Sequence, residues 1–337
     1  MQMPKRALGI SRLLQLGFAS VLATMAVVGA AQAADLSSKK VILVTCGPAN
    51  PWCKVFNERI VAGLEGAGVK VSVLESDLDP VQEVQQINQA ISQKPDLLMI
   101  EPADDKSLIA SIKKAKAAGV PVLYMDSPAD ASIMDDIALQ VIADNAALGR
   151  FAAQNLIDGL RERGLKSGNV IVITGTAGSQ MVQDRQKGFE EVMATAPEYK
   201  ILDVQDSNWD PVQSGKIAQQ LFAKYASQGG VDAVRADADY MAIPIIEAAK
   251  QAGMKVGVKN DGLVVTGTNC TAEGIQAIRA GDMYGTATED AWTQGIVTAE
   301  TAIAFLKGET VPKTVIVPEY RVHGPTLEKY AELCSKS

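Results

Sequence analysis

The sequence VILVTCGPANPWCKVFNERIVAGLEGAG occupies residues 41–68 and contains two patterns in succession. Its first residues form an apolar, β-branched run of the kind found in buried strands. A polar loop then ends in Asn50-Pro51-Trp52, and the next segment repeats apolar residues at helical spacing, at Phe56, Ile60, Gly63, Leu64 and Ala67. The stretch therefore predicts a strand, a loop that faces a ligand, and a helix.

The same alternation continues along the chain. Strands are predicted at 69–74, 96–100, 120–125, 169–174, 200–205 and 232–235, and helices at 81–92, 106–118, 147–161, 181–194, 213–226 and 241–252. Repeated strand–helix units predict parallel sheets with helices on both faces. About 300 residues exceed one comfortable core, so we expect two α/β domains of similar construction with a cleft between them. No sequence repeat between the two halves is obvious.

The first 33 residues have the composition of an export signal. Lys5, Arg6 and Arg12 precede a mostly apolar run from 13 to 28, and Ala31-Gln32-Ala33 fits a cleavage site. The apolar run is short for a membrane span. We expect cleavage after Ala33 and a protein that is free in the periplasm.

The net charge argues against nucleic acid as a partner. The chain has 32 Lys and Arg against 39 Asp and Glu, a net charge of −7. Residues 1–33 hold three basic and no acidic residues, so removing them leaves 29 basic against 39 acidic residues, or −10. A chain with this charge and no basic stripe repels polyanions.

Four cysteines follow the signal: Cys46, Cys53, Cys270 and Cys334. An oxidising compartment favours disulfides, and four cysteines allow three pairings. A zinc site is the competing interpretation, but the sequence has no C-x-x-C motif and only one histidine, His323. We therefore expect structural cysteines and no metal.

Ligands of parallel sheets bind at the loops that follow the strands. Here these loops are rich in amides, carboxylates, hydroxyls and tryptophan, over residues 46–52, 76–79, 101–105, 126–127, 176–183, 207–210, 237–240, 268–270 and 289–292. A hydrolase would need paired carboxylates or an activated nucleophile. The glycine-rich segment 174–179 lacks the Gly-Lys-Ser/Thr ending of a phosphate loop. We predict a binding protein with no catalytic residues and no cofactor.

The ordered set of motifs resembles the periplasmic sugar-binding proteins of ABC importers, of the ribose/galactose type. The matching segments are Asn50-Pro51-Trp52, 119–126, Ala143-Asp144-Asn145 with Gly149, 184–189 (DRQKGF), Asn208-Trp209-Asp210 and 238–242 (ADYMA). The resemblance implies that the chain crosses between domains three times, near Ala143, Glu289 and Val317. The N-terminal domain would then hold 34–143 plus 290–317, and the C-terminal domain 144–289 plus 318–337. It also favours a Cys270–Cys334 disulfide, and leaves Cys46 and Cys53 either bonded or free.

The resemblance also implies a set of ligand-binding residues. Trp52 and Trp209 match the family's aromatic positions, where rings stack on the C–H faces of sugars. Asn50 matches an amide that binds hydroxyl groups, and Asp126 matches an acid that accepts from two of them. Further candidates from the loops are Ser127, Gln183, Asp237, Asn269 and Glu289.

The departures from the family pattern bear on the ligand. Ser127 and Gln183 stand where ribose-type proteins have arginine, Asn269 replaces the usual Asp, and Glu289 replaces Gln. Arg185 is expected to pair with Asp184 rather than to meet the ligand. Such a pocket favours a neutral monosaccharide or polyol over ribose itself, and a small amine held between the tryptophans is the alternative.

The resemblance implies how such a protein works. A monomer closes about its hinge on a sugar or polyol and docks on the permease subunits of an ABC importer in the inner membrane. A membrane chemoreceptor is the alternative recipient. A sugar-responsive transcription regulator shares the fold, but it would carry a helix-turn-helix where this chain has its export signal.

Overall fold

The computed structural model describes residues 35–337. The predicted signal peptide, including its cleavage site after Ala33, lies outside this part of the chain. Within residues 35–337, no helix is long and apolar enough to cross a membrane.

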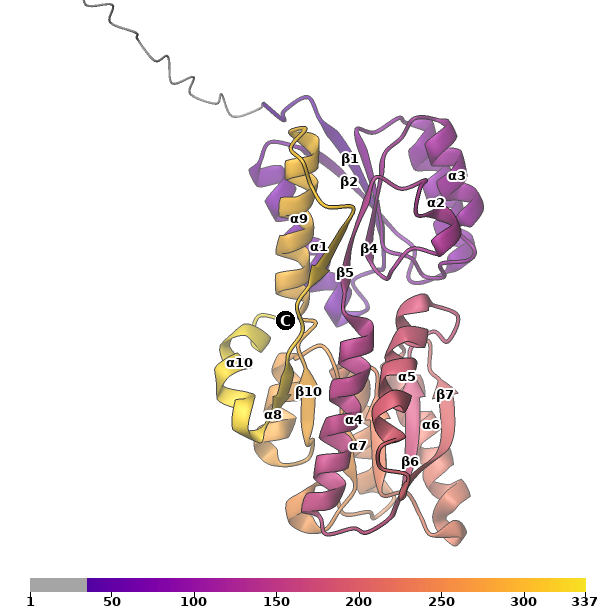
Figure 1. Cartoon of the computed structure of the whole chain (residues 1–337), viewed down its shortest axis with the longest axis vertical. Coiled ribbons are helices and arrows are strands. Elements are labelled where there is room, and N and C mark those ends of the chain that lie inside the picture. Colours follow the sequence, from indigo (N-terminus) through magenta and orange to yellow (C-terminus); the bar gives the residue numbers. More distant parts are fainter. Residues whose placement is uncertain (1–34) are drawn as a thin grey trace, which may run out of the picture. The chain divides into compact units, whose positions relative to one another are not determined.

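The first sheet is entirely parallel and has helices on both faces (Figure 1). Its strands have the order β11-β5-β4-β3-β1-β2. They are β1 (Lys40–Thr45), β2 (Lys70–Glu75), β3 (Leu97–Ile100), β4 (Val122–Asp126), β5 (Leu139–Ala143) and β11 (Thr314–Val317). Side chains alternate between the faces, as strand geometry requires. Val41 and Leu43 pack toward α1 (Pro51–Gly66) and α9 (Ala291–Leu306), while Ile42 and Val44 pack toward α2 (Pro80–Ser92) and α3 (Ile109–Ala117).

The second sheet repeats this arrangement, with the order β12-β10-β9-β8-β6-β7. Its strands are β6 (Gly168–Thr174), β7 (Tyr199–Asp206), β8 (Ala233–Ala236), β9 (Val264–Thr266), β10 (Gly285–Ala287) and β12 (Arg321–His323). One face carries α4 (Asn145–Glu162) and α5 (Gln180–Met193). The other carries α6 (Pro211–Tyr225), α7 (Asp239–Gln251), α8 (Ala272–Ala280) and α10 (Leu327–Cys334). Short 3-10 helices lie at Ala131–Ile133, Ala226–Gln228, Val258–Asn260 and Gly324–Thr326.

The prediction of parallel sheets needs one correction, at β12. This edge strand runs antiparallel to β10. Only Pro318–Tyr320 separate it from β11 in the other sheet. The first residue of β12, Arg321, pairs with Ala287, the last residue of β10. The chain thus enters the sheet at the edge where β10 ends, and β12 runs away from that edge, against its neighbour.

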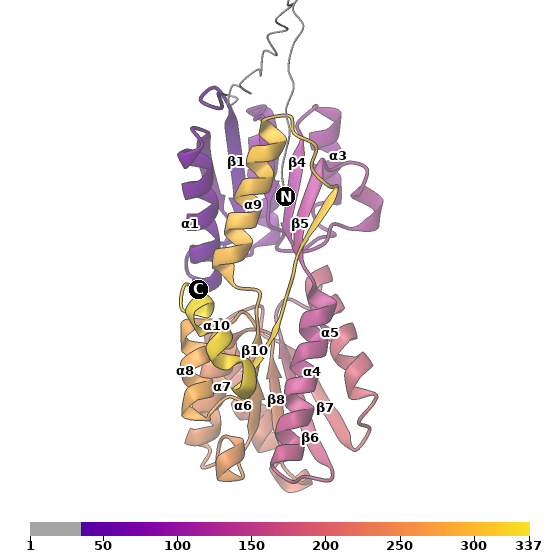
Figure 2. The same ribbon diagram turned by 60° about the vertical axis from the view of Figure 1, so that its left-hand side comes forward.

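The chain passes between the sheets at three places. β5 of the first sheet ends at Ala143 and α4 begins at Asn145. β10 of the second sheet ends at Ala287, and α9 returns to the first sheet from Ala291. Figure 2 shows α9 beside β1 and β4, which are far from it in sequence. The third passage is the short link from β11 to β12.

Contrary to our expectation, the two halves of the chain share a short sequence repeat. SDLDPVQ at 76–82 links β2 to α2, and SNWDPVQ at 207–213 links β7 to α6. We call these segments the twin turns. In both, the first two residues after the serine have positive φ, and the following aspartate caps the next helix. The same sequence therefore produces the same local structure at equivalent places in the two sheets.

Candidate functional site

A cavity lies where loops of the two sheets meet. The centres of water molecules can occupy about 40 Å³ of it, which is room for roughly three water molecules. Fifteen residues line it: Asn50, Trp52, Cys53, Leu78, Glu101, Pro102, Ala103, Asp126, Ser179, Met181, Arg185, Trp209, Tyr240, Asn269 and Glu289. Six of the nine predicted ligand residues are among them, namely Asn50, Trp52, Asp126, Trp209, Asn269 and Glu289.

The loop between β1 and α1 forms one wall of the cavity. Asn50 caps α1, because its Oδ1 accepts from the backbone N–H groups of Trp52 and Cys53. Its Nδ2 donates to the Tyr240 hydroxyl over 3.0 Å, and Trp52 Nε1 donates to the Glu289 carbonyl over 2.8 Å. The Asn50 side-chain amide therefore caps the N-terminus of α1 and also reaches the opposite wall of the cavity.

Two buried oxygens in the cavity wall have no hydrogen-bond partner in the structure. They are Asp126 Oδ1, at the end of β4, and Asn269 Oδ1, after β9. Both residues are about 5% exposed and come from different sheets. Buried acceptors are normally satisfied, and leaving one unpaired costs about 1–3 kcal/mol. The cavity therefore presents acceptors on two walls to a ligand that carries donors.

Five of the cavity residues have left-handed backbone conformations. The φ angles are 60° at Leu78, 66° at Asp126, 61° at Trp209, 91° at Asn269 and 78° at Glu289. Asparagine adopts such angles readily, whereas tryptophan and glutamate rarely do. Strained backbone of this kind gathers at functional sites, where it aims particular side chains.

Trp209 is held in place by the twin turn of the second sheet. Its ring lies against the backbone of Gly175, where an added Cβ would come 2.0 Å from Trp209 Cε2. The Arg185 guanidinium carbon lies 5.5 Å from the ring centroid on the cavity side, within cation–π range. A glycine is thus required at 175 because the indole occupies the space of its side chain.

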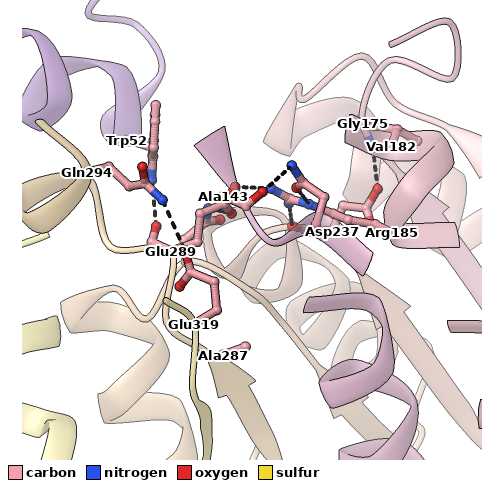
Figure 3. A network of polar contacts seen from close by, with 12 residues as sticks. Trp52, Ala143, Gly175, Val182, Arg185, Asp237, Ala287, Glu289, Gln294 and Glu319 are labelled. Atoms are coloured by element: carbon pink, nitrogen blue, oxygen red, sulfur yellow. Dashed lines mark hydrogen bonds and ion pairs between the residues drawn. The ribbon is translucent and has the colours of Figure 1, made fainter. Parts of the chain in front are cut away.

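Arg185 corrects the expected pair with Asp184. It is 1% exposed, and it donates to Asn145 Oδ1 (2.7 Å), to the Asp237 carbonyl (3.0 Å) and to Glu289 Oε1 (Figure 3). Asp184 instead accepts from Gln180. The prediction failed because Arg185 lies one residue further around α5 and points inward, where it joins the second sheet to the passage after β10.

Three predicted ligand residues do not line this cavity. Ser127 is buried and donates to Asp105 Oδ2. Asp237 is buried beneath the cavity, where it pairs with Arg235 and accepts from the N–H of Gly175. Gln183 is exposed on the outer face of α5, in a groove beside Val204. Each belongs to a ligand-facing loop or its adjacent helix, but a one-residue step turns a side chain to another face.

Seven further lining residues lie in the predicted ligand-facing loops but were not among the predicted ligand residues: Leu78, Glu101, Pro102, Ala103, Ser179, Met181 and Tyr240. The repeat between halves was the available signal. Ser179 caps α5 as Asn50 caps α1, and Met181 is the second residue of its helix as Trp52 is. Leu78 and Trp209 hold the same place in the twin turns. The cavity is therefore built from equivalent positions of two related halves.

Glu101 forms the floor beside β1. Burial, followed by the charge of Asp126, raises its pKa to about 7. The Thr45 hydroxyl lies within hydrogen-bond distance of both Glu101 Oε2 and Asn57 Oδ1. A hydroxyl has one proton, so a protonated Glu101 satisfies all three groups. Burial also raises the pKa of Asp126 to about 6, against the opposing effect of Arg185.

Both pairs of cysteines are joined in disulfides, Cys46–Cys53 and Cys270–Cys334. Among residues 35–337, the one grouping of potential metal ligands is Cys46, Cys53 and Glu101. Its two sulfur atoms are bonded to each other, so the oxidised protein offers a metal only the carboxylate there.

The family model for the periplasmic binding protein domain matches residues 25–310 of the chain. The chain belongs to this family. A ribose import binding protein of Haemophilus influenzae is 27% identical to this periplasmic binding protein. The match covers 88% of this chain and 94% of the relative. A xylitol-binding protein of Mycolicibacterium smegmatis is 26% identical to it, over 69% of this chain and 62% of the relative.

A solved structure of a galactofuranose binding protein has the same fold as this periplasmic binding protein. The TM-score is 0.80 at 21% identity, over 87% of this chain and 97% of the other. The likeness confirms the predicted fold of two α/β domains with parallel sheets.

Proposed function

We propose that this periplasmic binding protein captures a neutral monosaccharide or polyol in the cavity and delivers it to an ABC importer. The observation that supports the proposal best is the pair of unpartnered acceptors, Asp126 Oδ1 and Asn269 Oδ1, on walls from different sheets. Hydroxyl groups are donors that can satisfy both. Trp52, Trp209 and Met181 provide apolar surface for the C–H groups between them.

The charges favour a neutral ligand. Arg185 is the cation among the cavity residues, and protein acceptors already occupy its guanidinium. Its charge is balanced by Glu289, and the raised pKa values of Asp126 and Glu101 reduce the negative charge of the other two acids near neutral pH. An anionic ligand would find no free cation there, and the small volume favours one sugar unit over several.

The site works, in this proposal, by hinge closure. Residues 34–143 with 290–317 form one domain, and residues 144–289 with 318–337 form the other. The walls separate to admit a monosaccharide or polyol and close around it. Three bonds between the loops favour the closed arrangement: Asn50 to Tyr240, Trp52 to Glu289, and the Gln180 N–H to Asp105.

The wider setting follows from the family. We propose that the chain is exported, that its signal peptide is cleaved after Ala33, and that it acts as a monomer by binding rather than by catalysis. The recipient is the pair of permease subunits in the inner membrane.

The test is a thermal-shift screen of the mature protein against D-ribose, xylitol, myo-inositol, galactose and small amines. A ligand of the native state raises the melting temperature. We expect a hydroxylated compound to raise it, and Asp126→Asn to bind that compound at least tenfold more weakly, because one oxygen acceptor is replaced by a donor. Stabilisation by an amine, with none by any hydroxylated compound, would contradict the proposal.

A further inference from the structure

The Cys46–Cys53 disulfide encloses part of the candidate site. It joins the residue after β1 to the first turn of α1, across a separation of seven residues. The residues between the two cysteines include Asn50 and Trp52, and Cys53 itself lines the cavity. We call residues 46–53 the ligand loop.

The ligand loop carries two of the bonds that join the halves. Asn50 reaches Tyr240, and Trp52 reaches the carbonyl of Glu289. Asn50 also caps α1 through the N–H groups of Trp52 and Cys53. A movement at Cys53 would therefore disturb the cavity wall, the helix cap and both contacts together.

The surroundings of the two sulfur atoms differ. Cys46 is fully buried, its Sγ lies 2.9 and 3.0 Å from the Glu101 carboxyl oxygens, and its carbonyl accepts from Asn57. Cys53 is 2% exposed and borders the cavity. Bonded sulfur atoms lie about 2 Å apart, whereas non-bonded heavy atoms need roughly 3.5–4 Å. After reduction, Cys53 is the cysteine with space to move. That space is the cavity in which the proposed ligand binds.

We infer that the Cys46–Cys53 disulfide is a redox-sensitive determinant of ligand affinity, because it holds the ligand loop in the binding conformation and keeps Cys53 out of the cavity. The inference rests on the proposed function. A dithiol reductant transfers two electrons, the S–S bond breaks, each sulfur takes a proton, and the dithiol becomes a cyclic disulfide. The opened loop then binds sugars more weakly.

The second disulfide provides a matched control. Cys270–Cys334 ties the loop between β9 and α8 to the end of α10, with a separation of 64 residues, and neither cysteine lines the cavity. A longer closed loop stabilises a fold more. The two disulfides should therefore affect different properties: Cys46–Cys53 mainly ligand affinity, and Cys270–Cys334 mainly the stability of the fold.

The first experiment compares Cys46→Ser/Cys53→Ser with Cys270→Ser/Cys334→Ser by calorimetry and thermal denaturation. The ligand probe is whichever of D-ribose, xylitol and myo-inositol stabilises the wild-type protein most. We expect Cys46→Ser/Cys53→Ser to raise the Kd for this ligand at least tenfold. Its melting temperature should fall less than that of Cys270→Ser/Cys334→Ser. The second should keep Kd within about twofold and lose more melting temperature. An unchanged Kd in the first variant would overturn the inference.

The second experiment uses the unaltered protein, so it does not depend on variants that fold. Dithiothreitol is added with and without the same sugar, and free thiols are alkylated and located by mass spectrometry. Because coupling between binding and reduction is reciprocal, the sugar should slow alkylation at Cys46 and Cys53 at least tenfold, and leave Cys270 and Cys334 unaffected. Equal protection of both pairs would contradict the inference.

A third measurement separates this inference from the proposed function. Hydrogen–deuterium exchange is followed at residues 46–57 without any sugar, before and after reduction. Faster exchange there is expected; unchanged exchange would overturn the inference even if a sugar binds. If no hydroxylated compound of the screen binds the wild-type protein, the proposed function fails, and the exchange data still decide whether the disulfide orders the loop.

Discussion

Single residues in this protein do more than one task where the two halves meet. Arg185 pairs with Glu289 and lies under Trp209, and Asn50 both caps α1 and bonds to Tyr240. Glu101 bonds to Thr45 and stands beside the Cys46–Cys53 bond. Arg185 and Glu101 are buried and Asn50 is half-buried, so a substitution at any of them disturbs several contacts of the site together.

Glu101 makes the stability depend on pH. Its pKa is raised from 4.5 to about 7 by burial and by Asp126, so the folded protein holds its proton more tightly than the unfolded chain. The stabilisation is complete below about pH 4.5 and is lost as the pH rises through about 7; 2.5 pKa units amount to about 3 kcal/mol. Asp126, Asp239 and Glu319 have raised pKa values and act in the same direction.

We therefore expect the free energy of unfolding of Glu101→Gln to fall less than that of the wild type between pH 5 and pH 8. The amide resembles the protonated acid in shape and cannot ionise. Urea denaturation across this range measures the difference. Glu332→Gln, an exposed change on α10, is the control and should follow the wild type. A wild-type pH dependence in Glu101→Gln would show that Glu101 is ionised throughout.

At the scale of elements, the twin turns show how sequence specifies a local structure twice. Ser76 and Ser207 are buried, the two residues after each have positive φ, and Asp79 and Asp210 cap α2 and α6. Proline follows each cap at the first helical position, where its missing N–H is not needed. The apolar residue between, Leu78 or Trp209, is directed to the cavity.

Removing either cap should cost the same. Asp79 Oδ1 accepts from two backbone N–H groups at 2.8 and 3.2 Å, and Asp210 Oδ1 does so at 2.7 and 3.0 Å. We expect Asp79→Ala and Asp210→Ala each to lower the free energy of unfolding by about 1 kcal/mol. Urea denaturation measures both, with Gln82→Ala, an exposed residue of the same turn, as a control of unchanged stability. Very unequal losses would mean that the two turns are not equivalent.

At the scale of the molecule, the duplication gives the surface two similar patches. Val81 and Val212 follow the prolines of the twin turns and are 69% and 63% exposed. Neither turn contains Lys or Arg, whereas Asp77, Asp79 and Asp210 are exposed beside the valines. Two like surfaces, apolar at the centre and acidic around it, suit a partner with two similar basic sockets, such as the paired subunits of the proposed permease.

Val81→Ser with Val212→Ser should therefore abolish uptake, and each single change should reduce it severalfold. Uptake is measured in cells that lack the chromosomal copy, with the sugar that gives the largest thermal shift. Sugar affinity should not change, because neither valine lines the cavity. Ile316→Ser, at a residue 56% exposed on β11, is the control and should transport normally. Normal uptake by the double variant would exclude these turns as the docking surface.

The local patterns of the sequence were sufficient for the repeated strand–helix order and for the loops at the strand ends, and six of the nine candidate residues line the cavity. Those features depend on neighbours in the chain: apolar periodicity, proline after a capping residue, and polar groups at strand ends. The elements left unpredicted include β9, β10 and β12, which have three residues each, but also longer ones such as β5 and α9.

Only the tertiary structure decided which side chain of each loop enters the cavity. Arg185, Asp237 and Ser127 all lie near the site, but burial and partners from other elements turn Arg185 inward and take Asp237 and Ser127 out of it. The direction of β12 and the pairing of Trp52 with Glu289 likewise depend on residues far apart in sequence. Contacts of this kind are made by the packing of two halves, and a pattern read along one chain segment does not contain them.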